Sequence, residues 1–452
     1  MIRIILYTSF LLWSSLSLAQ DKKEYSFTLE EAITFALDSN YTAINARRDV
    51  AKAIKKKWET SATGLPQISA EISYQNNIKQ PITLLPAEIT GGLPGTFVPV
   101  TFGTKQNGSA TATLNQLIFD GSYLVGLQAA KVFLDFSKNS EEKTNLEIRK
   151  GVINAYGSVL LSEELISIFE KNKTTLEKNL FETRKIYENG FTEEESVEQL
   201  EITLLDIESQ LSNAKRTKVI ATQMFNLALG IDVSENVTLK DDLASLAYQN
   251  TNLSFLEASL NFENNIDYKI ASNLTQQRSL ELKLEKSKAL PTLSAFLNYG
   301  TSANSDSFTF FDSQQIWYQS SLLGIKMDIP IFSSGMRGAR TQQARIALEQ
   351  AKTDFKYTQQ NILLELNTAK SNYQFAIENY ENSKKNLSLS ERIEGKNQIK
   401  FKEGLSTSFD LRQAQNQLYT AQQQYFQSML EVITSKANLE TILNSPKSLQ
   451  TN

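Results

Sequence analysis

Two stretches of the chain repeat one another and decide its fold. GLPQISAEISYQ begins at Gly64 and ALPTLSAFLNYG begins at Ala289, about 225 residues later in a chain of 452. Each follows a long charged stretch of helical composition, and after its Leu-Pro pair apolar and polar residues alternate. Proline disfavours the helical conformation of the residue before it, so a helix ends there and the alternation predicts a strand. The repeated boundary indicates an internal duplication.

Other landmarks recur in the same order. IFDG at Ile118–Gly121 corresponds to IFSSG at Ile331–Gly335, and YENGF at Tyr187–Phe191 corresponds to FKEGL at Phe401–Leu405, which lies 214 residues later. Two units of this length are too few and too long for a solenoid. We therefore predict a first repeat at about 27–230 and a second at about 265–443, with equatorial segments at about 231–264 and 444–452.

Period-two alternation predicts one pair of strands in each repeat. Ile68, Ile72 and Tyr74, for example, alternate with polar residues. The predicted strands lie at about 66–76, 108–119, 291–301 and 316–331. Each is long enough to cross a bilayer when tilted. A water-soluble sandwich also shows alternation, but these four strands are widely separated by helices. Open edges are not tolerated in lipid and bacterial barrels begin at eight strands, so several copies of the chain must share one barrel.

The segments between paired strands differ in composition. The segment from about 76 to 108 is rich in Pro, Gly and Thr, which predicts a long exposed loop. Its equivalent in the second repeat contains Phe308, Phe310 and Phe311, and Trp317 follows. These aromatic side chains are typical of an interfacial girdle, and equally of residues that pack a loop.

Helices are expected at about 28–63, 121–229, 266–289 and 335–443. Apolar residues with three-four spacing predict coiled-coil seams. In the second repeat the seam comprises Leu348, Ala351, Phe355, Thr358, Ile362, Leu366, Ala369, Tyr373, Ala376 and Tyr380, then Leu411, Ala414, Leu418, Ala421, Tyr425, Ser428, Val432, Ser435, Leu439 and Ile442. The first repeat shows Val197, Leu200, Leu204, Ile207, Leu211, Ala214, Lys218, Ala221, Phe225 and Ala228 at matching places. At a rise of 1.5 Å per residue, a continuous helix of about 65 residues reaches roughly 100 Å. A hollow helical barrel is favoured over an isolated coiled-coil arm, because strands are attached to the same helices.

The ends and the composition restrict the function. Residues 1–19 contain Arg3, an apolar run from Ile4 to Trp13 and a small-residue site ending at Ala19, which predicts a signal peptide. After it, we expect no transmembrane helix. The net charge of −4 gives no electrostatic case for nucleic acid. The chain has no histidine and no cysteine, which excludes thiol and imidazole nucleophiles or bases, disulfides and ordinary zinc or copper sites. Enzymes can use carboxylates alone, but no carboxylates cluster in that way, so we expect no metal site, no cofactor, no catalytic residues and no enzymatic activity.

Two longer motifs carry a resemblance to a known family. PIFSSG at Pro330–Gly335 and FKEGLSTSFDLRQAQNQLYTAQQQYF at Phe401–Phe426, within the duplicated order of strands and helical hairpins, resemble the TolC family of outer-membrane efflux proteins. The resemblance covers essentially the whole mature chain. It implies an α+β membrane protein: a homotrimer with one 12-stranded β-barrel, four strands per protomer, continued by a long α-helical coiled-coil barrel. The location it implies is the outer membrane of a Gram-negative cell, extending into the periplasm.

The resemblance also implies a function without chemistry. Family members are passive exit ducts of tripartite efflux or type I secretion systems, held in outer-membrane lipid. They dock a periplasmic membrane-fusion adaptor and an inner-membrane RND or ABC transporter. A structural or adhesive outer-membrane coiled-coil protein without transport activity remains the alternative.

The family pattern assigns the candidate site residues. The two hairpin tips that meet the adaptor correspond here to Gly190, Phe191 and Thr192, and to Gly404, Leu405 and Ser406. Asp410 matches an acidic position that narrows the periplasmic entrance, so three copies would form an acidic ring. The chain departs from the pattern twice. Gln413 stands where a second acidic residue is familiar, and Ser406 where some members have a basic residue.

Overall fold

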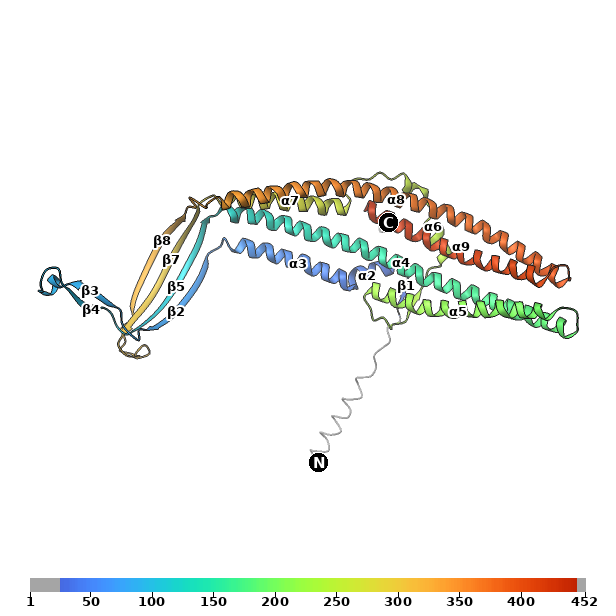
Figure 1. Cartoon of the computed structure of the whole chain (residues 1–452), viewed down its shortest axis with the longest axis horizontal. Coiled ribbons are helices and arrows are strands. Elements are labelled where there is room, and N and C mark those ends of the chain that lie inside the picture. Colours follow the sequence, from blue (N-terminus) through green and yellow to red (C-terminus); the bar gives the residue numbers. More distant parts are fainter. Residues whose placement is uncertain (1–24, 445–452) are drawn as a thin grey trace, which may run out of the picture. The chain divides into compact units, whose positions relative to one another are not determined.

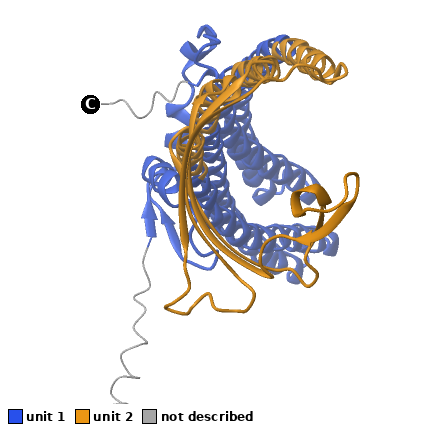
Figure 2. Cartoon of the chain, turned by 90° about the vertical axis from the view of Figure 1, so that its left-hand side faces the viewer, with its two compact units in different colours: residues 1–48, 139–270, 356–452 blue, residues 49–138, 271–355 orange. Residues whose placement is uncertain are grey.

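The computed structural model describes residues 25–444 (Figure 1). The predicted signal peptide and residues 445–452 of the second equatorial segment lie outside the described residues. The chain divides into two compact units, which Figure 2 distinguishes by colour. The sheet unit comprises residues 49–138 and 271–355, and the hairpin unit comprises residues 1–48, 139–270 and 356–452.

The sheet unit is built around four antiparallel strands. In spatial order they are β2 (Gln67–Asn76), β5 (Gln106–Phe119), β7 (Thr292–Ser305) and β8 (Tyr318–Asp328). The two strands of each repeat are neighbours, and β5 joins the repeats to each other through β7. Within residues 25–444, the outer edges of β2 and β8 have no partner strand.

The register gives the sheet one apolar and one polar face. Ile72 lies opposite Ala110, and Leu297 lies between Leu114 and Leu323. The apolar face comprises Ile68, Ala70, Ile72, Tyr74, Ala110, Ala112, Leu114, Leu297, Tyr299, Leu323, Ile325 and Met327. The polar face includes Ser69, Glu71, Ser73, Thr111, Thr113, Asn115, Asn298, Ser320 and Lys326. The predicted alternation is therefore confirmed, and Ile72 is 85% exposed on the apolar face.

The segment predicted as a loop between β2 and β5 has regular structure of its own. β3 (Ile82–Pro86) and β4 (Phe97–Thr101) form an antiparallel hairpin, joined through the 3-10 helix η2 (Ala87–Thr90). The segment is exposed, as expected, but it is not irregular. β-Branched and aromatic residues within it favour strands, while Gly91 and Gly95 supply positive φ angles in the connection.

The aromatic residues of the β7–β8 connection pack on the apolar face of the sheet. The Phe310 ring lies 5.6 Å from Tyr74 and 6.2 Å from Trp317, and Phe310 is only 9% exposed. A Cβ added to Gly108 would lie 3.0 Å from the Phe310 ring, so any larger residue there would push the ring aside. Phe310 therefore packs the loop, whereas Phe308 and Phe311 remain 58% and 90% exposed.

Eight α-helices make up most of the remaining described chain, and seven of them have eleven residues or more. These seven are α2 (Leu29–Ser39), α3 (Tyr41–Ala62), α4 (Gly121–Glu188), α5 (Glu194–Leu229), α7 (Ile266–Ser287), α8 (Met336–Lys402) and α9 (Ser408–Leu443). The division between the two units falls inside α3, α4, α7 and α8.

The helix expected at about 28–63 is interrupted at Asn40, so this prediction is wrong at that residue. Asn40 has an extended backbone, with φ −60° and ψ 135°. Its side-chain amide donates to the Ala228 carbonyl at 2.8 Å, and its side-chain oxygen accepts from the Thr42 N–H at 2.8 Å. Tertiary contact with the end of α5 and capping of α3 therefore stabilise the break.

The first equatorial segment adds small elements to the hairpin unit. β6 (Val237–Leu239) pairs in parallel with β1 (Tyr25–Phe27), and α6 (Leu243–Gln249) and η3 (Leu253–Leu256) follow. Tyr156 of α4 is fully buried beneath them, and its hydroxyl lies 2.8 Å from the Asp241 carboxylate. Burial raises the pKa of the Tyr156 hydroxyl, which keeps it protonated as a hydrogen-bond donor.

Buried seams join the helices of the hairpin unit. Most of the predicted seam residues are buried: Ala351, Ile362, Leu366, Ala369, Tyr373, Ala376, Tyr380, Leu411, Ala414, Leu418, Ala421, Ser428, Val432 and Leu439, and in α5 Val197, Leu200, Ile207, Leu211, Ala214, Ala221 and Phe225. The remaining predicted seam residues are only partly buried: Leu348, Phe355, Thr358, Tyr425, Ser435 and Ile442, and in α5 Leu204, Lys218 and Ala228. The seam also contains an ion pair. Arg149 of α4 and Glu440 of α9 lie 2.8 Å apart, with both side chains only 8% exposed.

One described helix is apolar enough to cross a membrane by length and composition. It is α4, and 44% of its most apolar 18-residue stretch is buried inside the protein. A single helix of this kind is weak evidence for a membrane span, so the prediction that no transmembrane helix follows the signal peptide is not contradicted. Core helices of soluble proteins pass the same test, and Val152 and Tyr156 of α4 belong to the main core.

Candidate docking tips and constriction

The first candidate tip is the turn between α4 and α5. The Gly190 N–H donates to the Tyr187 carbonyl at 2.8 Å, and the Phe191 N–H donates to the Ile186 carbonyl at 3.0 Å. This pair of bonds is a Schellman motif, which closes a helix when the next residue is left-handed. Gly190 supplies that conformation with φ 75°. Phe191 is 82% exposed, so the turn presents an aromatic ring to its surroundings.

The second candidate tip is the turn between α8 and α9, and it has the same Schellman motif. The Gly404 N–H donates to the Phe401 carbonyl at 3.1 Å, and the Leu405 N–H donates to the Lys400 carbonyl at 2.8 Å. Gly404 has φ 70°, and Leu405 is 77% exposed. Both repeats therefore end their first long helix with glycine and present the next apolar side chain.

The two tips differ in how the returning helix begins. At α9 a capping box is complete: the Asp410 carboxylate accepts from the Thr407 N–H at 3.0 Å, and the Thr407 hydroxyl accepts from the Asp410 N–H at 3.2 Å. At α5, Glu193 occupies the N-cap position without a side-chain capping bond. The second returning helix is thus the better capped of the two.

Asp410 is exposed in the first turn of α9. Hydrogen bonds from the Thr407 hydroxyl and then from the Thr407 backbone hold the pKa of the Asp410 carboxyl below its usual value of 3.8. The same carboxylate is therefore both a helix cap and a persistent negative charge. Among the described candidate site residues, no other forms a hydrogen bond with Asp410. Ser406 lies nearby in sequence, and its hydroxyl is buried without a hydrogen-bond partner within residues 25–444.

Side chains that the sequence-based assignment missed join the two hairpins near the tips. Ser196 of α5, the counterpart of Asp410 in the first repeat, donates to the Ser408 hydroxyl at 3.1 Å. Lys402 of α8 lies 3.3 Å from Glu182 of α4. The constant spacing between the repeats signals the equivalence of Ser196 and Asp410, but no sequence pattern predicts their partners.

A polar seam runs between the hairpins behind the tips. Asn172 donates to Gln422 at 2.8 Å, and both side chains are buried. Seven residues from Gln422, Gln415 is fully buried beside Glu394. Burial raises the pKa of the Glu394 carboxyl, and the hydrogen bond with Gln415 opposes that rise.

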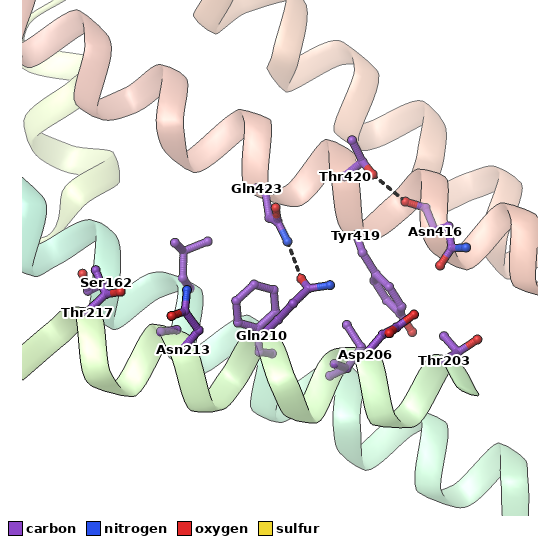
Figure 3. A pocket seen from close by; sticks show the side chains of 14 residues that line it. Ser162, Thr203, Asp206, Gln210, Asn213, Thr217, Asn416, Tyr419, Thr420 and Gln423 are labelled. Carbon is purple, nitrogen blue, oxygen red and sulfur yellow. Dashed lines mark hydrogen bonds between the residues drawn. The ribbon is translucent and has the colours of Figure 1, made fainter. Parts of the chain in front are cut away.

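A cavity of about 490 Å³ lies along α4, α5 and α9 in the same unit. Figure 3 shows Tyr419 of α9 directed toward α5, where Asp206 lies, while Gln423 donates to Gln210 across the cavity at 2.6 Å. Burial raises the pKa of the Tyr419 hydroxyl, so it stays neutral. Threonine, asparagine and glutamine make up half of the lining residues, which suits hydrogen bonding.

Comparison with known proteins connects this architecture to a family. Residues 263–445 match the family model described as outer membrane efflux protein. No curated protein sequence matches the chain significantly.

Solved structures match over nearly the whole chain. CusC is 17% identical and has a TM-score of 0.75, covering 94% of this chain and 95% of its own. VceC from Vibrio cholerae is 15% identical with a TM-score of 0.71, covering 92% and 95%. The CmeC outer membrane channel from Campylobacter jejuni is 15% identical with a TM-score of 0.71, covering 94% and 90%.

The family match falls on the second repeat, which contains both motifs that carried the resemblance, and the shared fold extends over both repeats. The predicted fold class is therefore confirmed. Residues 263–445 are therefore similar to the outer membrane efflux protein family, and the chain shares the fold of these solved outer-membrane proteins over nearly its whole length.

Proposed function

We propose that three copies of this chain form a passive duct through the outer membrane, which is the exit of a tripartite efflux or type I secretion system. The observation that carries this proposal is the open four-stranded sheet. Its strands have 10 to 14 residues, one of its faces is apolar, and its two outer edges are unpaired within the described chain. Such a sheet is stable in lipid only when copies close it into a barrel.

The opposite face of the sheet suits the inside of a duct. Serine, threonine and asparagine side chains predominate there, and Glu71 and Lys326 are exposed. A barrel with its apolar face toward lipid places these groups around a wet lumen. Transport then needs no chemistry from the protein, which agrees with a family of channels.

The hairpin tips are the proposed contact with a periplasmic adaptor, which in turn engages an inner-membrane transporter. Phe191 and Leu405 support this role, because both are large apolar side chains left exposed beside a glycine turn. Two such tips per copy offer six similar anchors around a trimer. Apolar anchors surrounded by polar groups are typical of protein interfaces.

Asp410 is the proposed constriction residue. Three copies on a threefold axis bring three carboxylates together, and a ring of negative charge in a narrow pore favours cations. The Thr407 hydrogen bonds fix the direction of each carboxylate, so the ring is organised before an ion arrives.

Single-channel conductance in planar lipid bilayers tests the proposal. We expect the purified protein to give a small, cation-selective conductance that multivalent cations block. Asp410→Asn removes the charge and retains an oxygen that can cap α9, so we expect multivalent cations no longer to block the conductance of this variant. Thr407→Ala removes the hydroxyl that caps α9 and retains the charge of Asp410. We therefore expect multivalent cations still to block the conductance of this variant at neutral pH.

Each result separates one part of the proposal. A trimer that is intact but never conducts would favour the structural or adhesive alternative. Conductance with unchanged block in Asp410→Asn would support the duct and reject Asp410 as its constriction. Loss of block in both variants would show that the fold of the tip matters rather than the charge.

A further inference from the structure

The β3–β4 hairpin carries an apolar face that its own copy leaves uncovered. Ile82, Leu84 and Phe97 are 67%, 61% and 61% exposed. The cross-strand pairs place Ile82, Leu84 and Pro86 beside Phe97 and Pro99 on one side of the hairpin. These five residues form the hairpin face. Figure 1 shows β3 and β4 projecting beyond the ends of β2 and β5, away from the four-stranded sheet of the same unit.

The composition of the segment is unlike that of a solvated loop. Between Ile78 and Thr104 only Lys79 and Glu88 are charged, although 21% of the chain is charged. The Glu88 carboxylate is used internally, since it accepts from the Gly95 N–H at 3.0 Å. Depletion of charge with enrichment of aromatic and aliphatic groups marks the core of a protein interface. An isolated two-stranded hairpin is also marginally stable in water, so this one requires a partner.

The place of the hairpin in the topology indicates which partner covers it. It grows from the end of β2, which is the unpaired edge strand of the sheet. In the proposed trimer this edge is where the neighbouring copy adds its β8 strand. The hairpin therefore stands at the seam between two copies, and the surface that covers its apolar face is continuous with the barrel interface.

We infer that the hairpin face docks against a neighbouring copy of the chain, so that the copies interlock outside the barrel as well as through its strands. The inference rests on the proposed trimer. It adds a second contact region, specific to this insertion between β2 and β5, which holds the copies together where the strands end.

Site-specific photo-crosslinking tests directly which molecule covers the hairpin face. Benzoylphenylalanine replaces Leu84 in one variant and Lys79 in another; Lys79 is exposed in the same segment but lies outside the hairpin face. Each purified trimer is irradiated in detergent and again in liposomes, and covalent products are separated after denaturation. We expect a covalent dimer of the chain from position 84 in both media, at least about tenfold above that from position 79.

The outcomes are distinct. Intact trimers without a dimer product from position 84 would overturn the inference, as would a product formed with lipid alone in liposomes. If the first variant fails to assemble, the same probe at Ile82 asks the same question, because Ile82 lies two residues away on the same face. Failure of the unaltered protein to form trimers or to conduct would instead reject the proposed function.

Discussion

At the scale of single residues, Asp410 links the local fold to the proposed selectivity. Its carboxylate is 2.7 Å from the Thr407 hydroxyl and closes the capping box of α9. A group whose pKa is lowered on folding stabilises the folded state above its unfolded pKa, and that contribution is lost as pH falls through the folded pKa. The helix cap and the negative charge therefore disappear together on acidification.

The pH dependence of the cation block should follow the protonation of the Asp410 carboxylate. We expect block to persist at pH 3.8, the ordinary pKa of an aspartate, and to fall with a midpoint below it. Thr407→Ala removes the hydroxyl hydrogen bond, the larger cause of the lowered pKa, and keeps the backbone one, so its midpoint should move up part of the way toward 3.8. Conductance measured with a fixed concentration of blocking cation between neutral and acidic pH gives both midpoints. Equal midpoints in the two proteins would contradict a role for Thr407.

A buried charge pair gives a second prediction at the residue scale. Removing one partner of a buried ion pair costs about 3–5 kcal/mol, because the other charge stays buried, whereas replacing both with apolar residues is often neutral. Arg149→Met should therefore destabilise the hairpin unit, because Glu440 then keeps only its longer contact with Lys436 at 3.8 Å. The triple variant Arg149→Met, Glu440→Leu and Lys436→Met removes all three charges and should recover most of the loss. Urea unfolding of the solubilised protein compares them. Equal destabilisation of the single and triple variants would argue that shape, not charge, matters here.

At the scale of elements, two glycines of the same helical hairpin have opposite roles. Gly404 ends α8 with φ 70°, whereas Gly395 lies inside α8 with open space around its Cα. Alanine at a left-handed position costs about 1–2 kcal/mol, and alanine in place of a helical glycine gains about 0.5–1 kcal/mol. Gly404→Ala should lower the unfolding midpoint and Gly395→Ala should raise it.

The same pair of variants separates folding from docking at the second tip. Adaptor binding to Gly395→Ala should be unchanged, because the substitution leaves the turn intact. Binding to Gly404→Ala should weaken if the turn geometry presents Leu405. A stable Gly404→Ala variant with unaltered binding would remove this glycine from the proposed interface.

Elements also differ in how well the sequence predicts them. Alternation and three-four spacing predicted the faces of the sheet and the seams because both patterns directly reflect burial. The break at Asn40 was missed because its cause is a hydrogen bond to Ala228, which is distant in sequence. The β3–β4 hairpin was missed because its prolines and glycines indicate a loop, although the residues between them pair. The candidate tips follow from repeat spacing, whereas the Ser196–Ser408 contact depends on tertiary packing.

At the scale of the whole molecule, the orientation of the sheet in lipid can be tested on neighbouring residues. Ile72 lies on the apolar face of β2 and Ser69 on its polar face. A lysine on the lipid-facing side of a barrel costs about 2–4 kcal/mol near the bilayer midplane, and far less in the lumen. Ile72→Lys should greatly reduce the yield of liposome-inserted trimers, and Ser69→Lys should leave it nearly unchanged. The opposite order would place the polar face toward lipid.

The open edges of β2 and β8 also bear on how the protein is made. Within residues 25–444, a single copy has two unpaired strand edges and an exposed apolar face, which in the proposed barrel further copies and lipid cover. Completion of its fold therefore depends on meeting further copies, and the rate depends on their concentration in the cell envelope. Until then, unpaired edges favour aggregation, so biogenesis requires the single chains to be shielded on their way to the membrane.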